Sequence, residues 1–221
     1  MLRRALGWRI GLVWILSTLA APVPALAGHC APLCRSFAIG DARSLPWGTA
    51  WWQGRPDYNV ASLVSDTEAL LVPSTPVVVR METIRRASLY ASRDRTVAEQ
   101  LLSTLMTRGR NAEQAGHPDA LALFDAAYAA NTLYQIGAYD DVPEVRDLVP
   151  RAMGLVREGD PYQLVKKSLA LRPEDPGLQF GAALIASLRP EDQPAYRDHS
   201  RKARAGARQD PLVMLNLRYI S

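Results

Sequence analysis

The sequence predicts an all-α protein with an irregular N-terminal arm. Three observations support this fold class. From about residue 60 onward, apolar residues recur at spacings of three and four, which is the period of an amphipathic helix. Three Asp-Pro pairs each precede an apolar run, and such a pair places a capping side chain before a proline at the first helical position. Residues 28–58, by contrast, are rich in glycine, proline and tryptophan, a composition typical of irregular structure.

Residues 1–27 have the order of parts of a secretory signal peptide. Three arginines precede an apolar run over about residues 10–21, and the small residues Ala25 and Ala27 follow at the positions that a signal peptidase recognises. The apolar run is shorter than the roughly 20 residues of a membrane-spanning helix. We therefore expect Sec-type export, cleavage after Ala27 and a location in the periplasm or outside the cell. Retention of this segment as a membrane anchor is the alternative.

Removal of the predicted signal peptide changes the charge balance. The whole chain carries a net charge of +4. The signal peptide contains three of the 26 basic residues and none of the 22 acidic ones, so the remaining 194 residues carry a net charge of +1. This small excess is not that of a nucleic-acid-binding protein, and we expect no nucleic-acid partner. We also expect no stable membrane span after cleavage.

The predicted arm, residues 28–58, contains three tryptophans, Trp47, Trp51 and Trp52. Each indole ring buries a large apolar area when it packs against other residues. We therefore expect the rings to pack the arm against the helical body. An aromatic platform that contacts a ligand, a carbohydrate or a partner is the alternative.

The arm also contains the two cysteines of the chain, Cys30 and Cys34, directly after His29. An even number of cysteines in an exported chain predicts a structural disulfide between them. Two thiolates and one imidazole are the alternative, a metal site one ligand short of a closed zinc centre or suited to Cu(I). Redox chemistry is a further alternative, although the spacing differs from that of thioredoxin-like motifs. We expect no cofactor.

The first two expected helices of the helical domain (residues 59–221) lie on either side of Pro73. The second begins at Pro76 with Thr75 as its cap, and it ends near Ser92. One face of this second helix is expected to be buried. It carries Val77, Met81, Ile84, Ser88 and Ala91.

The next two helices are predicted by their caps and by their apolar content. Asp94 caps the third helix, and Gly109 is expected to end it. Its apolar stripe consists of Val97, Leu101, Leu102, Leu105 and Met106. The fourth helix, residues 118–137, is the most apolar, so we expect it at the centre of the fold with Gly137 as its stop.

The last third of the domain contains the clearest helix starts. One helix is expected over about residues 148–157, and another from Pro194 to about Arg208. Three more begin at Asp160-Pro161, Asp175-Pro176 and Asp210-Pro211. Because the loops between these helices are short, the helices are expected to pack as antiparallel hairpins.

Two segments of this region are similar to each other. Residues 167–180 align with residues 202–215 at an offset of 35 residues, which places Asp175 over Asp210. A period near 34 residues with two helices per unit resembles the tetratricopeptide (TPR) repeat, and ALRPEDP resembles the junction between two such repeats. The resemblance covers about residues 160–221. It implies a helical solenoid whose concave face binds a peptide or protein, and a compact helical bundle is the alternative.

The sequence supplies no candidate catalytic residues. No two of the three histidines lie four residues apart, as the two histidines of a helical zinc site do. Glu82 lies at ion-pair spacing from Arg85 and Arg86, which predicts a solvated or interhelical ion pair. An anion or partner site formed by Arg80, Arg85 and Arg86 is the alternative. A second basic run is expected to be a soluble outer face, with an anionic lipid or acidic partner as the alternative. It contains Arg197, Arg201, Lys202, Arg204 and Arg208.

These observations favour a non-enzymatic interaction or scaffold protein of the bacterial cell envelope. It would bind a protein or peptide partner in a groove between helical hairpins. A metal- or redox-active envelope protein that uses His29, Cys30 and Cys34 is the second hypothesis. A helical hydrolase whose site is assembled only by the fold is the third.

Overall fold

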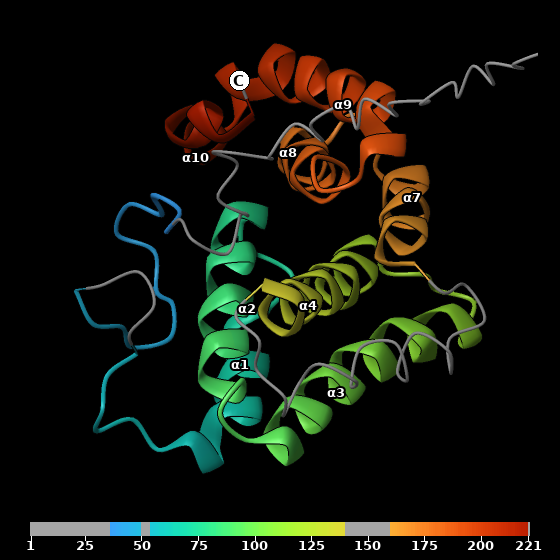
Figure 1. The fold of residues 1–221 in the computed structure, drawn as a ribbon. Helices are drawn as coiled ribbons and strands as arrows, with labels where there is room; N and C mark the ends of the chain where they lie inside the picture. The colour runs from blue at the N-terminus through green and yellow to red at the C-terminus, as the bar shows by residue number, and fades with distance from the viewer. Residues whose placement is uncertain (1–35, 50–53, 140–159, 221) are drawn as a thin grey trace, which may run out of the picture.

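The structure is a computed structural model that describes residues 36–49, 54–139 and 160–220. These residues form eight α-helices and four short 3₁₀ helices and contain no strand, which confirms the all-α class (Figure 1). The described part of the arm, residues 36–49 and 54–58, contains neither helix nor strand. Several predictions fall outside the described residues. They concern the signal peptide (1–27), His29, Cys30, Cys34, Trp51, Trp52 and the helix at 148–157.

The first four helices form one group. They are α1 (Leu63–Leu70), α2 (Val77–Ala91), α3 (Arg95–Gln114) and α4 (Ala120–Tyr139). Helix α1 packs against α2 and α3, and helix α4 contacts α2 and α3 on one side and the later helix α7 on another (Figure 1). Every residue from 120 to 133 is buried, so the predicted central position of this helix is confirmed.

The last four helices form a second group around α8. They are α7 (Pro161–Leu171), α8 (Pro176–Ala186), α9 (Gln193–Gly206) and α10 (Pro211–Asn216). Helices α9 and α10 both contact α8 and cover it at the top of Figure 1. The three predicted Asp-Pro starts are confirmed, because Asp160, Asp175 and Asp210 each accept hydrogen bonds from backbone N–H groups of the first turn.

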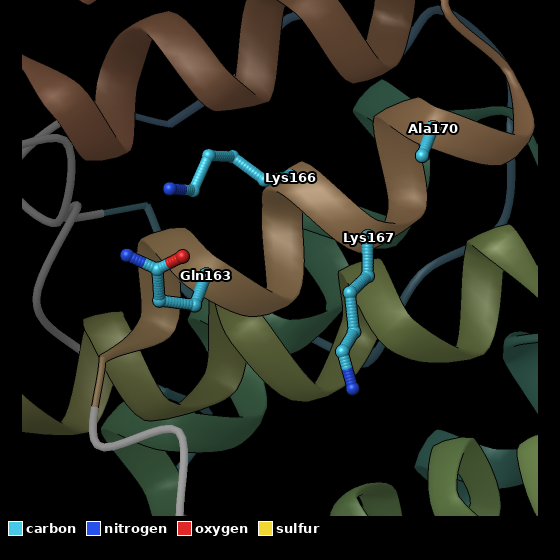
Figure 2. A pocket seen from close by; sticks show the side chains of 4 residues that line it. All are labelled: Gln163, Lys166, Lys167 and Ala170. Carbon is cyan, nitrogen blue, oxygen red and sulfur yellow. The ribbon is translucent and has the colours of Figure 1, made fainter.

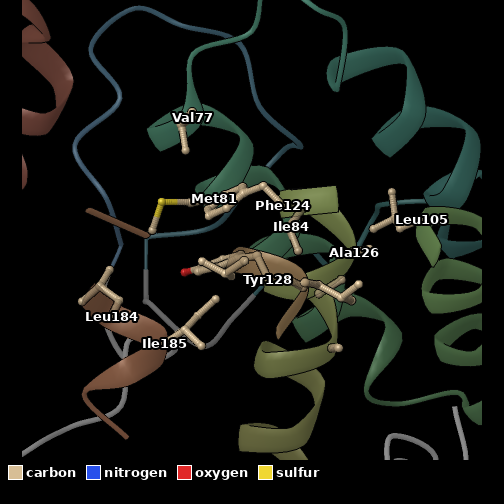
Figure 3. Packing of buried hydrophobic residues seen from close by; sticks show 14 of the residues in the cluster. Val77, Met81, Ile84, Leu105, Phe124, Ala126, Tyr128, Leu184 and Ile185 are labelled. Carbon is tan, nitrogen blue, oxygen red and sulfur yellow. The ribbon is translucent and has the colours of Figure 1, made fainter. Parts of the chain in front are cut away.

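One hydrophobic core joins the two groups. Side chains of α2, α4 and α8 point toward one another in Figure 3, among them Met81, Phe124 and Ile185. A Cβ atom on Gly181 of α8 would overlap the ring of Phe124, and one on Gly177 would lie 2.7 Å from the Val77 Cβ. The missing side chains therefore let α8 approach α4 and α2 closely. The arrangement is compatible with a helical bundle or with a solenoid.

Two predicted helix ends are wrong. Helix α3 continues past Gly109, which is buried against the backbone of Ala122 on α4, and the helix ends at Gln114. Its end is formed by Gly116, whose φ of 73° is favourable for glycine. Helix α4 likewise continues through residue 137 to Tyr139. A glycine in a helix costs only about 1 kcal/mol, so packing against another helix can outweigh it.

Helix α2 also differs from its prediction. It begins at Val77, one residue later than expected, and the Thr75 hydroxyl does not cap it but donates a hydrogen bond to the Leu70 carbonyl. Thirteen of its fifteen residues are buried, not one face alone. The arm covers the face of α2 that carries Glu82 and Arg85, which the sequence predicts to form a solvated or interhelical ion pair.

Candidate functional site

The Arg80 side chain is fully buried, and its hydrogen-bond partners are groups of the protein itself. Its guanidinium donates two hydrogen bonds to Asp125 of α4, at 2.9 and 2.8 Å, and others to the carbonyls of Leu71 and Val72. Burial raises the pKa of Asp125 to about 6, and the attraction of Arg80 opposes that rise. This pair therefore connects α2 to α4 and to the end of α1.

Glu82 binds the other two arginines of α2. Its carboxylate accepts two hydrogen bonds from Arg85, both at 2.8 Å, one from Arg86 at 2.7 Å, and one from the backbone N–H of Phe37 in the arm. The predicted ion pairs are confirmed, whereas the predicted solvation is wrong for Glu82 and Arg85, which are fully buried. Since Arg80 binds Asp125, the three guanidinium groups of the suggested anion site do not share a partner.

Trp47 packs the arm over these charges. Its ring lies 5.3 Å from the Arg85 guanidinium carbon and 5.9 Å from that of Arg86, and it meets the Tyr90 ring edge-on at 5.2 Å. The Arg86 guanidinium also donates to the Leu45 carbonyl at 2.6 Å. The predicted packing role is therefore confirmed for Trp47.

Tyr90 binds the arm at two points. Its hydroxyl donates to the Pro46 carbonyl at 2.7 Å and accepts from the Arg55 backbone N–H at 2.8 Å. Gly54 lies so close to the Tyr90 ring that a Cβ atom would overlap it. A hollow of about 280 Å³ remains between the arm and the end of α2, with Tyr58, Tyr90 and Arg93 in its lining. The tyrosine hydroxyls there are bound within the protein, since that of Tyr58 donates to Asp66.

A buried chain of polar groups connects α7, α8 and α9. The His199 ring lies between Tyr162 and Gln179, with its Nε2 2.8 Å from the Tyr162 hydroxyl and its Nδ1 2.6 Å from the Gln179 Oε1. The Gln179 amide nitrogen donates to the Pro173 carbonyl, so its Oε1 accepts from Nδ1–H and the tyrosine donates to Nε2. Burial lowers the pKa of His199. His199 lies within the basic run of the sequence, but its ring is buried on the inner face of α9.

A pattern in the sequence indicates that His199 is buried, although the charged residues around it make this pattern hard to recognise. His199, Ala203 and Ala207 recur every four residues, and all three are buried. A stripe of small residues that includes a histidine indicates the inner face of a helix. The Tyr162–His199–Gln179 chain is suited to proton exchange, but each member is buried and hydrogen-bonded to the next, so we assign it a structural role.

A broad hollow lies along α7. It has a volume of about 610 Å³, and the described residues that line it are Gln163, Lys166, Lys167 and Ala170. Their spacing places them on one face of the helix, and Figure 2 shows the two lysines extending from α7 in different directions. Lys167 pairs with Glu113 of α3 at 3.2 Å, and the Lys166 ammonium lies 5.6 Å from the centre of the Tyr162 ring. Carbon atoms make up most of the exposed lining, which also includes an amide and two lysine side chains.

The outer face of α9 presents a row of arginines. We define the α9 arginine stripe as Arg197, Arg201 and Arg204 of α9 together with Arg208 of the 3₁₀ turn that follows it (Ala207–Gln209). All four are exposed, and they are spaced by four, three and four residues. The opposite face of α9 contacts α8. Described residues 160–220 contain ten Lys or Arg and seven Asp or Glu, whereas the described residues up to 139 contain nine and ten. The positive charge of the described chain is therefore concentrated in its last four helices.

Neither a metal centre nor a membrane-crossing helix occurs within the described ranges. No three of their His, Cys, Asp and Glu side chains form a group that could hold a metal ion. None of their helices combines the length and the apolar character that a membrane span requires. The disulfide, metal and redox predictions for His29, Cys30 and Cys34 concern residues outside these ranges and stay predictions. Comparisons of the chain with protein-family models, with curated proteins and with solved structures found no match.

Proposed function

We propose that the chain is an exported, non-enzymatic scaffold or interaction protein of the bacterial cell envelope, and that it binds a protein or peptide partner in the hollow along α7. One observation carries this proposal. The hollow is broad and open, whereas the polar groups with catalytic potential, Tyr162 and His199, are buried and bound to each other. Export rests on the N-terminal sequence pattern.

The lining of the hollow suits an extended or helical segment of a partner. Sites for small molecules enclose most of the ligand, whereas the hollow along α7 is broad and open. Gln163 offers an amide, Lys166 offers a cation, and the small Ala170 leaves room for a side chain of the partner. This lining favours a polar or acidic peptide over a metabolite.

The resemblance to TPR proteins supports the same function. Proteins of that family bind peptides on the concave face of stacked helical hairpins. In this chain, α7 with α8 and α9 with α10 are each joined by four residues, 172–175 and 207–210. The metal- or redox-active alternative rests on the sequence of residues 29–34 alone.

Site-specific photo-crosslinking in intact cells tests the proposal. A photoreactive amino acid is placed at the exposed positions Gln163 and Ala170, and at the exposed α3 positions Ser103 and Thr107 as matched controls. We expect the α7 positions to yield a discrete adduct with another protein and the α3 positions to yield none. Adducts of equal yield at both sets of positions, or none at either, would overturn the proposal.

A further inference from the structure

We propose that the α9 arginine stripe binds an acidic α-helix of a partner protein. The inference rests on the proposed function, because it names the chemistry of the partner that the interaction protein recognises. It concerns a different face from the α7 hollow, and it stands on the exposure, the spacing and the pairing of four arginines.

The stripe is a regular row on a rigid element. A rise of about 1.5 Å per residue in α9 and about 2 Å per residue in the 3₁₀ turn separates successive arginines by roughly 4.5 to 7 Å and spans about 17 Å from Arg197 to Arg208. The inner face of α9 is held by buried residues such as His199 and Ala203. Helix α9 and the 3₁₀ turn after it therefore present the four guanidinium groups from a fixed backbone.

Much of the stripe's hydrogen-bonding capacity is not used by the described residues. Arg197 and Arg208 make no ion pair or hydrogen bond with any other described residue. Arg201 pairs with Asp198 and keeps 72% of its side chain exposed, while Arg204 donates one hydrogen bond to the Ile220 carbonyl at 2.8 Å. Each guanidinium has five N–H donors, so even the latter two have donors left for a partner.

The chemistry and spacing fit carboxylates carried on a helix. A planar guanidinium binds a carboxylate through two parallel hydrogen bonds, which a lysine cannot do. Glutamates spaced by four, three and four residues on a partner helix have the same rise as the stripe. An acidic helix that lies along α9 can therefore meet all four arginines at once.

The composition of α9 argues against a lipid surface. Helices that bind at a membrane surface insert large apolar residues beside their basic ones. The only large apolar or aromatic side chain between Gln193 and Gly206 is Tyr196, and it packs against the core. Asp198 lies among the arginines and pairs with Arg201 and Lys202, so it orients both side chains.

Fluorescence anisotropy with a defined peptide tests the inference. The probe is an alanine-based helical peptide with glutamates at positions 1, 5, 8 and 12, and a second peptide has the same composition with its glutamates distributed around the helix. The protein is the full chain, its stripe variant (R197Q/R201Q/R204Q/R208Q) and a scattered variant with the same loss of charge (R43Q/R93Q/R110Q/R172Q). All eight positions are exposed, and circular dichroism checks folding.

We expect the stripe variant to bind the ordered peptide about tenfold more weakly than the native chain, and the scattered variant to bind within about twofold of it. Higher salt should weaken native binding, because the contacts are exposed. Equal binding of the two peptides, or equal losses in the two variants, would overturn the inference. Binding to anionic phospholipid vesicles that depends on the stripe, with no peptide binding, would also overturn it in favour of a membrane.

A second experiment separates this inference from the proposed function. The stripe substitutions are combined with the photoreactive residue at Ala170. Loss of most of the adduct supports both proposals. An undiminished adduct would overturn the role of the stripe and leave the proposed function standing, whereas the absence of any adduct from the native stripe would contradict the proposed function itself.

Discussion

Helices α2 and α9 both carry closely spaced arginines, yet the structure uses the two sets in opposite ways. Arg80 and Arg85 of α2 are fully buried and bound to carboxylates of the chain. On α9 and the 3₁₀ turn that follows it, Arg197 and Arg208 are exposed and bind no described residue. Both sets of arginines are clustered along a short stretch of chain, so clustering alone does not decide whether they are buried.

The surroundings of the two sets explain the difference. Large apolar residues lie between the arginines of α2, so burying that helix gains apolar area that offsets the desolvation of its charges. The buried carboxylates of Glu82 and Asp125 then neutralise those charges. Helix α9 has mostly alanine and polar residues, so only one narrow face is buried. Arginines are therefore buried where large apolar residues and a carboxylate lie beside them.

The largest expected effect comes from removing the carboxylate that neutralises α2. Glu82→Gln removes the buried carboxylate that pairs with Arg85 and Arg86, and breaking a buried ion pair in this way costs about 3–5 kcal/mol in similar cases. We expect a loss of this size in the free energy of unfolding, measured by urea denaturation. Glu99→Gln is the control, because it breaks the exposed pair with Arg95, worth less than about 1 kcal/mol. Equal losses in the two variants would show that Glu82 is not an internal counter-charge.

A smaller effect is expected where the arm meets α2. Gly54→Ala places a methyl group inside the space of the Tyr90 ring, and overpacking of this kind costs about 1–3 kcal/mol. We expect lower stability and faster proteolysis of the arm. Gly109→Ala is the control, since its nearest new contact would be an ordinary 3.5 Å, and it should leave stability unchanged or raise it. An arm that tolerates the methyl group would mean that it does not cover α2 as closely as described.

A pH-dependent effect of smaller size distinguishes the inner face of α9 from its outer face. Burial lowers the pKa of His199, so the folded protein binds this proton less readily than the unfolded chain, whose histidine has a pKa of about 6.5. The contribution of His199 to stability is therefore present above that value and is lost as the pH falls below it, by at most about 1.4 kcal/mol per pH unit.

The measurement compares the native chain with His199→Gln at several pH values. The difference between their free energies of unfolding should shrink from pH 7.5 to pH 5.5. His117→Gln is the matched control for the loss of an imidazole that is exposed. A difference for His199→Gln that does not change with pH would contradict the burial of this ring on the inner face of α9.

Much of the fold could be predicted because its signals are local. The Asp-Pro pairs specify helix starts through bonds between Asp160, Asp175 or Asp210 and residues two or three positions later. The apolar composition of α4 likewise predicts its central position. The continuation of the helices past Gly109 and Gly137 could not be predicted in this way. A glycine ends a helix in one context and lets a neighbouring helix approach in another.

The candidate sites depend on contacts between distant residues, so the sequence predicts them poorly. Arg80 is buried because Asp125, 45 residues later, can pair with it. His199 meets Tyr162 across 37 residues, and no short motif marks that pair. The exposed row on α9 could be predicted as a helix face. The sequence could not show that Arg197 and Arg208 bind no described carboxylate, because that depends on where the fold places the carboxylates.

The most direct test of the account compares the stripe and scattered variants in one titration with the ordered-glutamate peptide. Both variants lose four exposed arginines, and both should unfold within about 1 kcal/mol of the native chain because exposed charges contribute little to stability. The account predicts a dissociation constant about tenfold higher for the stripe variant than for the scattered variant. Equal dissociation constants would contradict the claim that the arginines of α9, unlike those of α2, are available to a partner.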